Sequence, residues 1–299
     1  MLASIFLGAF LGVAASVAFP LLHRRGAVTD LTPDQISAYK PYALFSRAAY
    51  CPASLTANWT CGAPCTDLAG FVPHASGGDG IATPYWYVGY HTAHHSVIVG
   101  NQGTDTSKFV PLLIDLSLQL QELNPRLFPG VSPSVKVHSG FGRAQKRSAV
   151  AKLDAVKRAM AKHGTNHVTL AGHSLGGAIS LIDSLFLSIN LPNAKLKVVT
   201  HGMPRVGNRE FANLVDSKIS DLARINNGHD VIPIVPGIRL GFTHTSGEKR
   251  IINPGHWIAC DGQDNEDESC TAGAVFNILF GDIDDHSSPY DGVPVAGCS

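Results

Sequence analysis

The sequence predicts an α/β fold, in which a mostly parallel central sheet carries helices on both faces. Length and composition support this first: the chain has 299 residues, 44% of them hydrophobic and 15% charged, which is enough to bury one large core. Strand-like and helix-like segments also alternate between residues 85 and 226. Such alternation is typical of parallel strands joined by crossover helices. No repeat or linker divides the chain, so we expect a single domain over residues 26–299.

The individual elements follow from composition and periodicity. The expected strands cover residues 85–90, 96–100, 167–171, 195–200 and 222–226. The expected helices cover residues 142–163, 178–191 and 210–218. In the first of these helices Val150, Leu153, Val156 and Met160 share one face, and Gly164 is placed to end it.

The first two strands are separated by a short turn near Thr92, which predicts a surface hairpin. His91, His94 and His95 lie in or beside this turn. A metal cluster is the alternative, but no carboxylate pattern joins these histidines. The hairpin is therefore the better interpretation.

The N-terminal segment predicts export. Residues 2–19 are nearly all apolar or small, a length compatible with a short transmembrane helix or with the core of a signal peptide. The segment starts at the first residue and ends in Ser16-Val17-Ala18, which fits a cleavage site. We therefore expect a signal peptide over residues 1–18, a short pro-segment to about Arg25, and a secreted mature protein without a membrane span.

The six cysteines indicate disulfides, because thiols are oxidised outside the cell and the paired C-x-x-C spacings of zinc sites are missing. Six cysteines allow many pairings, so proximity alone leaves the connectivity open. Proximity favours Cys61 with Cys65 and Cys260 with Cys270, which leaves Cys51 with Cys298.

Charge excludes one class of partner. Lys plus Arg and Asp plus Glu both number 23, and no basic stripe is present, so nucleic acid is not an expected partner. No cofactor or metal is implied. Asn58-Trp59-Thr60 is the one N-glycosylation sequon, and its use would place Asn58 on the surface.

The segment Gly172-His173-Ser174-Leu175-Gly176-Gly177 carries the predicted chemistry. A strand precedes it and a helix follows it, which is the context of a nucleophile elbow. In that turn the serine is exposed in a strained conformation, and the flanking Gly172 and Gly176 avoid clashes. A serine needs a base and oxyanion donors to act as a nucleophile. The elbow therefore predicts an α/β-hydrolase with Ser174 as nucleophile, while His173 should point away in a structural role.

The elbow also predicts the order serine, acid, histidine along the chain. Asp230 lies in a loop just past the strand at residues 222–226, where the acid is expected. The other carboxylates are expected to be solvated or to cap helices, and these are Asp183, Asp216 and Asp221. Three histidines follow Asp230, namely His244, His256 and His286. His286, in a polar loop near the C-terminus, is the favoured base.

Five segments resemble the fungal class 3 lipases, the filamentous-fungal triacylglycerol lipase family that also contains feruloyl esterases. They span nearly the whole mature chain and are Val137–Phe141, Val168–Gly177, His201–Asn208, His229–Pro233, and Asp285-His286 with Tyr290. The resemblance implies that Ser174 is the nucleophile, Asp230 the acid and His286 the base. It also implies a structural role for His244 with Glu248. The disulfides that it implies are Cys51–Cys298, Cys61–Cys65 and Cys260–Cys270.

The resemblance further implies an oxyanion hole formed by the backbone N–H of Leu175 and by Thr104. In the family this segment usually reads F-R-G-[ST], whereas this chain has Asn101-Gln102-Gly103-Thr104. The donor position is kept, but the aromatic residue and the arginine are replaced. The support of the oxyanion loop must therefore differ.

A lid is expected near residues 105–122. Phe109, Leu112, Leu113, Leu116 and Leu120 form an apolar helical face there. An ordinary core helix is the alternative on periodicity alone, but the position after Thr104 matches the lid of the resembled family. The tryptophan common in such lids is missing.

Together these features predict a secreted serine ester hydrolase, most simply a monomeric triacylglycerol lipase acting at a lipid–water interface through an acyl-enzyme. A feruloyl-type or short-chain carboxylesterase is the nearest alternative, and the leucine-rich segment argues against it. A non-catalytic lipid-binding protein on the same fold is an alternative of another class. It is disfavoured because all three candidate triad residues are present.

Overall fold

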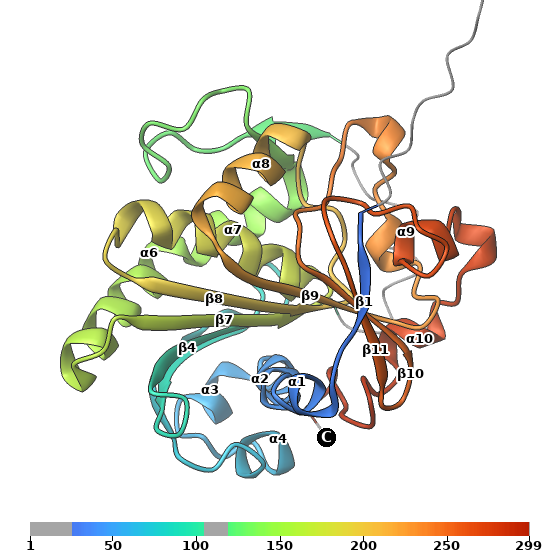
Figure 1. Ribbon diagram of the computed structural model, residues 1–299. Helices are drawn as coiled ribbons and strands as arrows, with labels where there is room; N and C mark the ends of the chain where they lie inside the picture. Colours follow the sequence, from blue (N-terminus) through green and yellow to red (C-terminus); the bar gives the residue numbers. More distant parts are fainter. Residues whose placement is uncertain (1–25, 105–118, 299) are drawn as a thin grey trace, which may run out of the picture.

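The structure is a computed structural model that describes residues 26–104 and 119–298. A nine-stranded sheet organises them in the order β1-β11-β10-β9-β8-β7-β4-β3-β2 (Figure 1). Its strands are β1 Val28–Asp30, β2 Phe71–Gly77, β3 Trp86–His91, β4 Ser96–Asn101, β7 His167–His173, β8 Lys195–His201, β9 Asp221–Asn227, β10 Glu248–Asn253 and β11 His256–Cys260. A small second sheet pairs β5 (Leu120–Glu122) with β6 (Lys136–His138).

The centre of the main sheet is parallel, as predicted. Strands β4, β7, β8, β9 and β10 run in one direction, while the pairs at both ends of the sheet are antiparallel. Central parallel strands are covered on both faces and therefore consist largely of apolar residues. Residues 168–173 of β7 are all buried. The predicted hairpin at Thr92 is present, because β3 and β4 pair antiparallel on either side of it.

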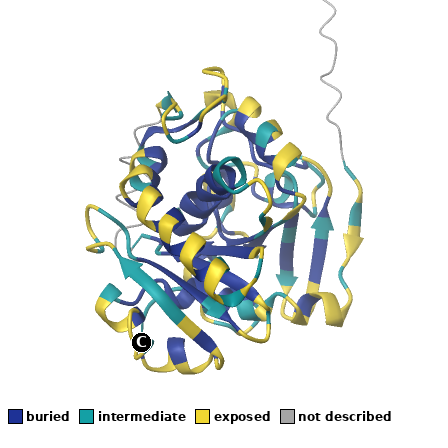
Figure 2. Cartoon of the chain, turned by 90° about the vertical axis from the view of Figure 1, so that its left-hand side faces the viewer, coloured by how far each residue is buried: buried dark blue, intermediate teal, exposed yellow. Residues whose placement is uncertain are grey.

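Helices cover both faces of the sheet (Figure 1). On one face lie α6 (Ser139–His163), α7 (Leu175–Asn190) and α8 (Arg209–Lys218). On the other face lie α1 (Pro33–Ser37), α2 (Lys40–Ala48), α3 (Ala53–Thr56) and α4 (Ala63–Thr66). Figure 2 shows that the strands are buried between these layers while the outer sides of the helices are exposed. Two short helices, α9 (Thr271–Ala274) and α10 (Asp284–Ser287), follow the last strand.

Helix α6 differs from the prediction in one respect. Val150 was expected on the buried face, but it is 56% exposed, while Leu153 and Val156 are buried. The buried stripe includes Ala149 and Ala159 instead, small residues that let the helix approach the sheet closely. Gly164 ends the helix in a left-handed conformation, φ 62° and ψ 32°, as predicted.

The structure contains the three disulfides that the family resemblance implied. Two of these disulfides, Cys61–Cys65 and Cys260–Cys270, each link residues that are near in sequence. The third, Cys51–Cys298, spans 247 residues of sequence and ties the α2–α3 connection to the C-terminal end. Asn58 is exposed, as a used sequon requires, and its glycosylation stays a prediction.

Several predictions concern residues outside the described ranges. These are the signal peptide at residues 1–18, the pro-segment to about residue 25, and the greater part of the lid, with Phe109, Leu112, Leu113 and Leu116. Leu120, the last residue of the expected apolar face, begins β5. Among residues 26–104 and 119–298, no helix combines the length and apolar character needed to cross a membrane.

Candidate active site

Ser174 lies in the sharp turn between β7 and α7, with φ 56° and ψ −126°. A positive φ is strained for a residue with a side chain, and such strain is typical of a nucleophile elbow. The two flanking glycines are explained by close approaches. A Cβ on Gly172 would lie 2.4 Å from the carbonyl oxygen of Gly176, and one on Gly176 would lie 2.1 Å from that of Asn101. The elbow therefore needs glycine at both positions.

Asp230 and His286 form a buried pair. Asp230 follows β9, His286 lies on α10, and both side chains are fully buried. His286 Nδ1 lies 2.7 Å from Asp230 Oδ2, and the other carboxylate oxygen accepts the Ile232 N–H at 2.8 Å. Because a carboxylate only accepts, Nδ1 carries the proton and Nε2 is left as the basic nitrogen. Burial lowers the pKa of His286 to about 3, which keeps the imidazole neutral, and burial raises the pKa of Asp230.

The end of β8 links the imidazole to the elbow. The Ser174 N–H donates to the His201 carbonyl at 2.9 Å. The next residue, Gly202, packs against the imidazole so closely that a Cβ would lie 2.7 Å from His286 Nδ1. The rings of His286 and His173 are 4.4 Å apart, centroid to centroid. The three residues predicted from sequence thus come from separate segments to one place at the carboxyl end of the parallel strands.

His173 supports the base from the interior, a role that sequence reasoning left unspecified. Its Nε2 lies 2.9 Å from the His286 carbonyl oxygen, so it donates there. Its Nδ1 then accepts from the Tyr50 hydroxyl at 2.6 Å. Burial lowers the pKa of His173 well below its usual value, which keeps this ring neutral. Tyr50 and His173 therefore fix the main chain at His286, and Tyr50 carries no sequence motif that would have revealed this.

The segment from Asn101 to Thr104 packs directly on the elbow. A Cβ on Gly103 would lie 2.6 Å from the His173 carbonyl oxygen and 2.1 Å from the Tyr50 hydroxyl. Gln102 is held by two hydrogen bonds with Tyr85: its N–H donates to the Tyr85 carbonyl, and its Oε1 accepts the Tyr85 N–H. Thr104 Oγ1 is buried and makes no hydrogen bond with the described part of the chain. Thr104 directly follows Gly103, which packs against the residue before Ser174.

A buried ion pair lies below this segment and is hydrogen-bonded to Asn101. Lys152 of α6 and Asp183 of α7 are each 2% exposed and bonded to each other. Lys152 Nζ also donates to Asn101 Oδ1 at 3.0 Å, and Asn101 Nδ2 donates to Asp183 Oδ2 at 3.1 Å. Asp183 Oδ1 accepts from Gln145 at 3.0 Å. The expectation that Asp183 is solvated or caps a helix is wrong, because α7 is covered by the sheet on one side and by α6 on another.

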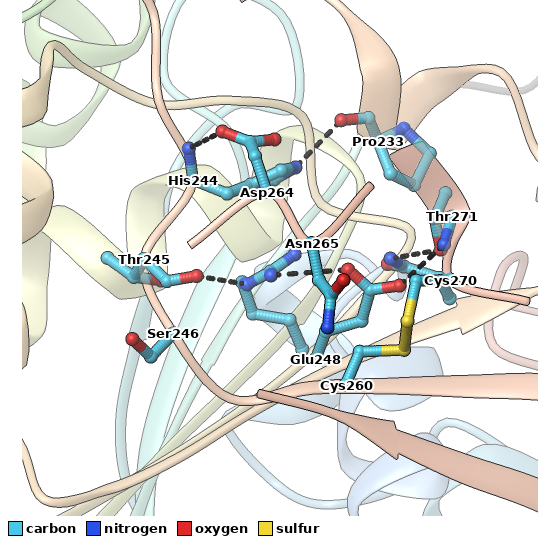
Figure 3. A network of polar contacts seen from close by, with 12 residues as sticks. Pro233, His244, Thr245, Ser246, Glu248, Cys260, Asp264, Asn265, Cys270 and Thr271 are labelled. Atoms are coloured by element: carbon cyan, nitrogen blue, oxygen red, sulfur yellow. Dashed lines mark hydrogen bonds and ion pairs between the residues drawn. A yellow bond between two sulfur atoms is a disulfide. The ribbon is translucent and has the colours of Figure 1, made fainter. Parts of the chain in front are cut away.

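A second network supports the loop after β9 that carries Asp230, which we call the acid loop (Figure 3). His244 Nε2 donates to the Pro233 carbonyl at 2.7 Å, three residues after Asp230, and the His244 N–H donates to Asp264. Glu248 pairs with Arg224 at 3.5 Å and accepts the Thr271 N–H at 2.8 Å. His244 and Glu248 thus lie where a structural role was expected for them.

The remaining candidates lie elsewhere. His256 is exposed and pairs with Asp30 at the far edge of the sheet. Asp216 accepts from Ser246, and Asp221 pairs with Lys197. Within the described ranges, the one group with metal-ligand geometry comprises Glu248, Cys260 and Cys270, and its two sulfurs are joined in a disulfide.

A serine at a nucleophile elbow beside a buried Asp–His pair, on a central parallel sheet, defines a serine hydrolase of the α/β-hydrolase class.

Comparisons with known proteins show to which family within this class the chain belongs. The sequence model of the family described as "Lipase (class 3)" matches residues 98–240. The chain is 32% identical to the secreted mono- and diacylglycerol lipase MDL2 of Malassezia globosa over 296 residues, covering 94% of this chain and 91% of that protein. The chain belongs to the class 3 lipases. It is a secreted ester hydrolase.

Other similarities agree with this assignment. The secreted mono- and diacylglycerol lipase LIP4 of Malassezia restricta is 32% identical over 179 residues, which cover 59% of each chain. Lipase II from Rhizopus niveus superimposes with a TM-score of 0.80 at 25% identity, covering 91% of this chain and all of that one. The α/β-hydrolase prediction is confirmed by this likeness.

Proposed function

We propose that Ser174, His286 and Asp230 are the catalytic triad. Ser174 Oγ attacks the acyl carbonyl of the ester while His286 Nε2 takes the hydroxyl proton, and Asp230 stabilises the resulting imidazolium. His286 then protonates the leaving alcohol, and a water molecule repeats the cycle on the acyl-enzyme. The 2.7 Å contact between His286 Nδ1 and Asp230 Oδ2 is the observation that carries the proposal, because it leaves Nε2 as the base.

The oxyanion of the tetrahedral intermediate is stabilised by the Leu175 N–H and by Thr104. Leu175 is the first residue of α7, where backbone N–H groups have no partner within the helix. The buried Thr104 hydroxyl supplies a second donor. Donors held in place before the reaction cost no reorganisation when the charge develops.

The proposed substrates are acylglycerols presented at a lipid–water interface, cleaved by the protein as a monomer. The names of the Malassezia relatives support acylglycerols, including mono- and diacylglycerols. Tri-, di- and monoolein, a short-chain acetate ester and methyl ferulate should be compared as substrates, with Ser174→Ala as the control.

We expect the highest activity on an oleoylglycerol and none in Ser174→Ala. A maximum on methyl ferulate or on the acetate ester would replace the lipase by the feruloyl or short-chain esterase, with the triad unchanged. Undiminished hydrolysis by Ser174→Ala would refute the triad. Lipid binding without hydrolysis by the unaltered protein would favour the non-catalytic alternative.

A further inference from the structure

Four large apolar side chains stand exposed on the segment between α9 and α10. Phe276 is 64% exposed, Ile278 61%, Leu279 86% and Phe280 57%. We call these four residues the apolar ridge. The Phe276 and Phe280 rings lie 4.2 Å apart, so the exposed residues adjoin one another. Single exposed apolar residues are ordinary, but a contiguous group marks an interaction surface.

The ridge is held firmly at its base. Cys270, bonded to Cys260, precedes α9, and Val275 is buried against Val231 of the acid loop. Within the ridge, Asn277 Oδ1 accepts the Leu279 N–H at 2.8 Å. A disulfide, an apolar anchor and a local turn therefore present the side chains outward, rather than leaving them on a loose chain.

The ridge is also joined directly to the active site. Just after Phe280, Gly281 packs so closely on the acid loop that a Cβ would lie 2.3 Å from Val231. The Asp282 N–H then donates to the His229 carbonyl at 2.8 Å, next to Asp230. His286 follows four residues later. In Figure 1 the connection between α9 and α10 lies at the right-hand side of the molecule. A surface that covers the ridge would thus lie beside the catalytic pair.

Charge indicates what kind of surface fits. Between Asp261 and Asp291 the chain has nine acidic residues and no Lys or Arg. Asp282 and Asp284, which follow the ridge in sequence and which we call its acidic border, are exposed. Anionic membranes attract basic segments and repel acidic ones. An acidic border beside the apolar ridge therefore favours an uncharged lipid surface over an anionic one.

We propose that the apolar ridge inserts into the surface of neutral, ester-containing lipid and brings the active site to its substrate. The proposal rests on the proposed function for the identity of the lipid. The ridge supplies apolar area to the interface, and the acidic border discriminates against anionic lipid. Phe and Leu side chains are suited to such shallow insertion.

The test is vesicle binding by the double variant Leu279→Ser/Phe280→Ser. Binding is measured in a Ser174→Ala background, so that no hydrolysis occurs, on phosphatidylcholine vesicles with diolein and with or without phosphatidylglycerol. The control is Ile81→Ser. Ile81 is 88% exposed, like Leu279, but it lies between β2 and β3 at the opposite end of the sheet.

We expect the ridge variant to bind neutral vesicles at least about tenfold more weakly, because each large apolar side chain contributes about that factor when buried. Ile81→Ser should bind within about twofold of the parent, and phosphatidylglycerol should not strengthen binding. With Ser174 intact, the ratio of activity on emulsified diolein to activity on a water-soluble ester should fall by a similar factor.

Unchanged vesicle binding by the ridge variant would overturn the proposal. So would an equal loss of binding in Ile81→Ser, or an equal loss of activity on emulsified and soluble esters. A change of oligomeric state in the ridge variant, seen by sedimentation, would assign the ridge to a second copy of the chain and would also refute it. Because binding is read without hydrolysis, failure of the proposed function leaves this test intact.

Discussion

The ammonium group of Lys152 and the carboxylate of Asp183 are bonded to each other in the interior, directly below the segment that carries Thr104. Both charges are almost inaccessible to water, and Asn101 joins them to the end of β4. A buried pair of this kind is costly to break, because removing one partner leaves the other charge unpaired in a medium that solvates it poorly.

Replacing Lys152 by Met should therefore destabilise the protein by about 3–5 kcal/mol. The variant keeps the volume of the side chain and leaves Asp183 charged and unpaired. Adding Asp183→Asn should recover much of the loss, since the charge is then gone. Urea denaturation followed by circular dichroism measures both changes.

The matched control is Lys197→Met, in the exposed pair with Asp221. Exposed pairs contribute about 0–1 kcal/mol. Equal losses in Lys152→Met and Lys197→Met would show that the buried pair contributes no more than a surface pair.

Tyr50→Phe should slow catalysis with little effect on KM. The change removes the hydroxyl that donates to His173 Nδ1 and so loosens the ring that holds the His286 main chain. Loss of one such hydrogen bond is expected to lower kcat about fivefold. Steady-state kinetics on a soluble ester provides the measurement.

Tyr87→Phe provides the comparison for this variant. Its hydroxyl is also buried and donates to the Phe45 carbonyl at 2.8 Å, away from His173. The Tyr87→Phe variant should lose about as much stability as Tyr50→Phe but should keep the kcat of the unaltered protein. If both variants lose kcat equally, the effect comes from general destabilisation and the assigned role of Tyr50 is wrong.

Stability should fall as the pH falls below about 6.5. Burial lowers the pKa of His201 and of His286 to about 3, and it lowers those of His173 and His244 well below the usual value. Between these folded-state values and about 6.5 the unfolded chain binds protons that the folded chain does not, so acid favours unfolding.

Each such histidine contributes up to about 1.4 kcal/mol per pH unit in this window. Asp230 has the opposite effect. Because its pKa is raised in the folded state, protonation of Asp230 stabilises the folded protein as the pH falls toward the ordinary value of an Asp carboxyl group. This single carboxyl group is opposed by the four histidines. The free energy of unfolding in urea, measured from pH 7.5 to pH 5, tests this. Constant or rising stability toward pH 5 would contradict it.

Much of the fold could be predicted from sequence because its centre is regular. The strand before Ser174 and the helix after it are strongly apolar and lie within three residues of their predicted bounds. Strands β1, β2, β10 and β11 of the main sheet were missed, and so were β5 and β6. Strands β1 and β10 mix polar and apolar residues, and β1 pairs at the sheet edge with β11, which is distant in sequence.

The supporting residues of the site were harder to predict than the triad. Ser174, Asp230 and His286 follow a known order and carry motifs. Asp183 was misjudged because a single carboxylate on a helix is usually solvated, and only the packing of α6 on α7 brings Lys152 to it. One signal was present: Lys152 interrupts the apolar stripe of α6 beside Leu153 and Val156.

The most direct test of the proposed triad is covalent labelling with an alkyl p-nitrophenyl phosphonate, an acyl-transfer mimic, followed by peptide mapping. We expect one adduct, on Ser174, with a labelling rate that falls by at least about 10³-fold in His286→Ala and in Asp230→Asn. Ser174→Ala should take no label. An adduct on another serine, or labelling that persists at the original rate without His286, would contradict the assignment.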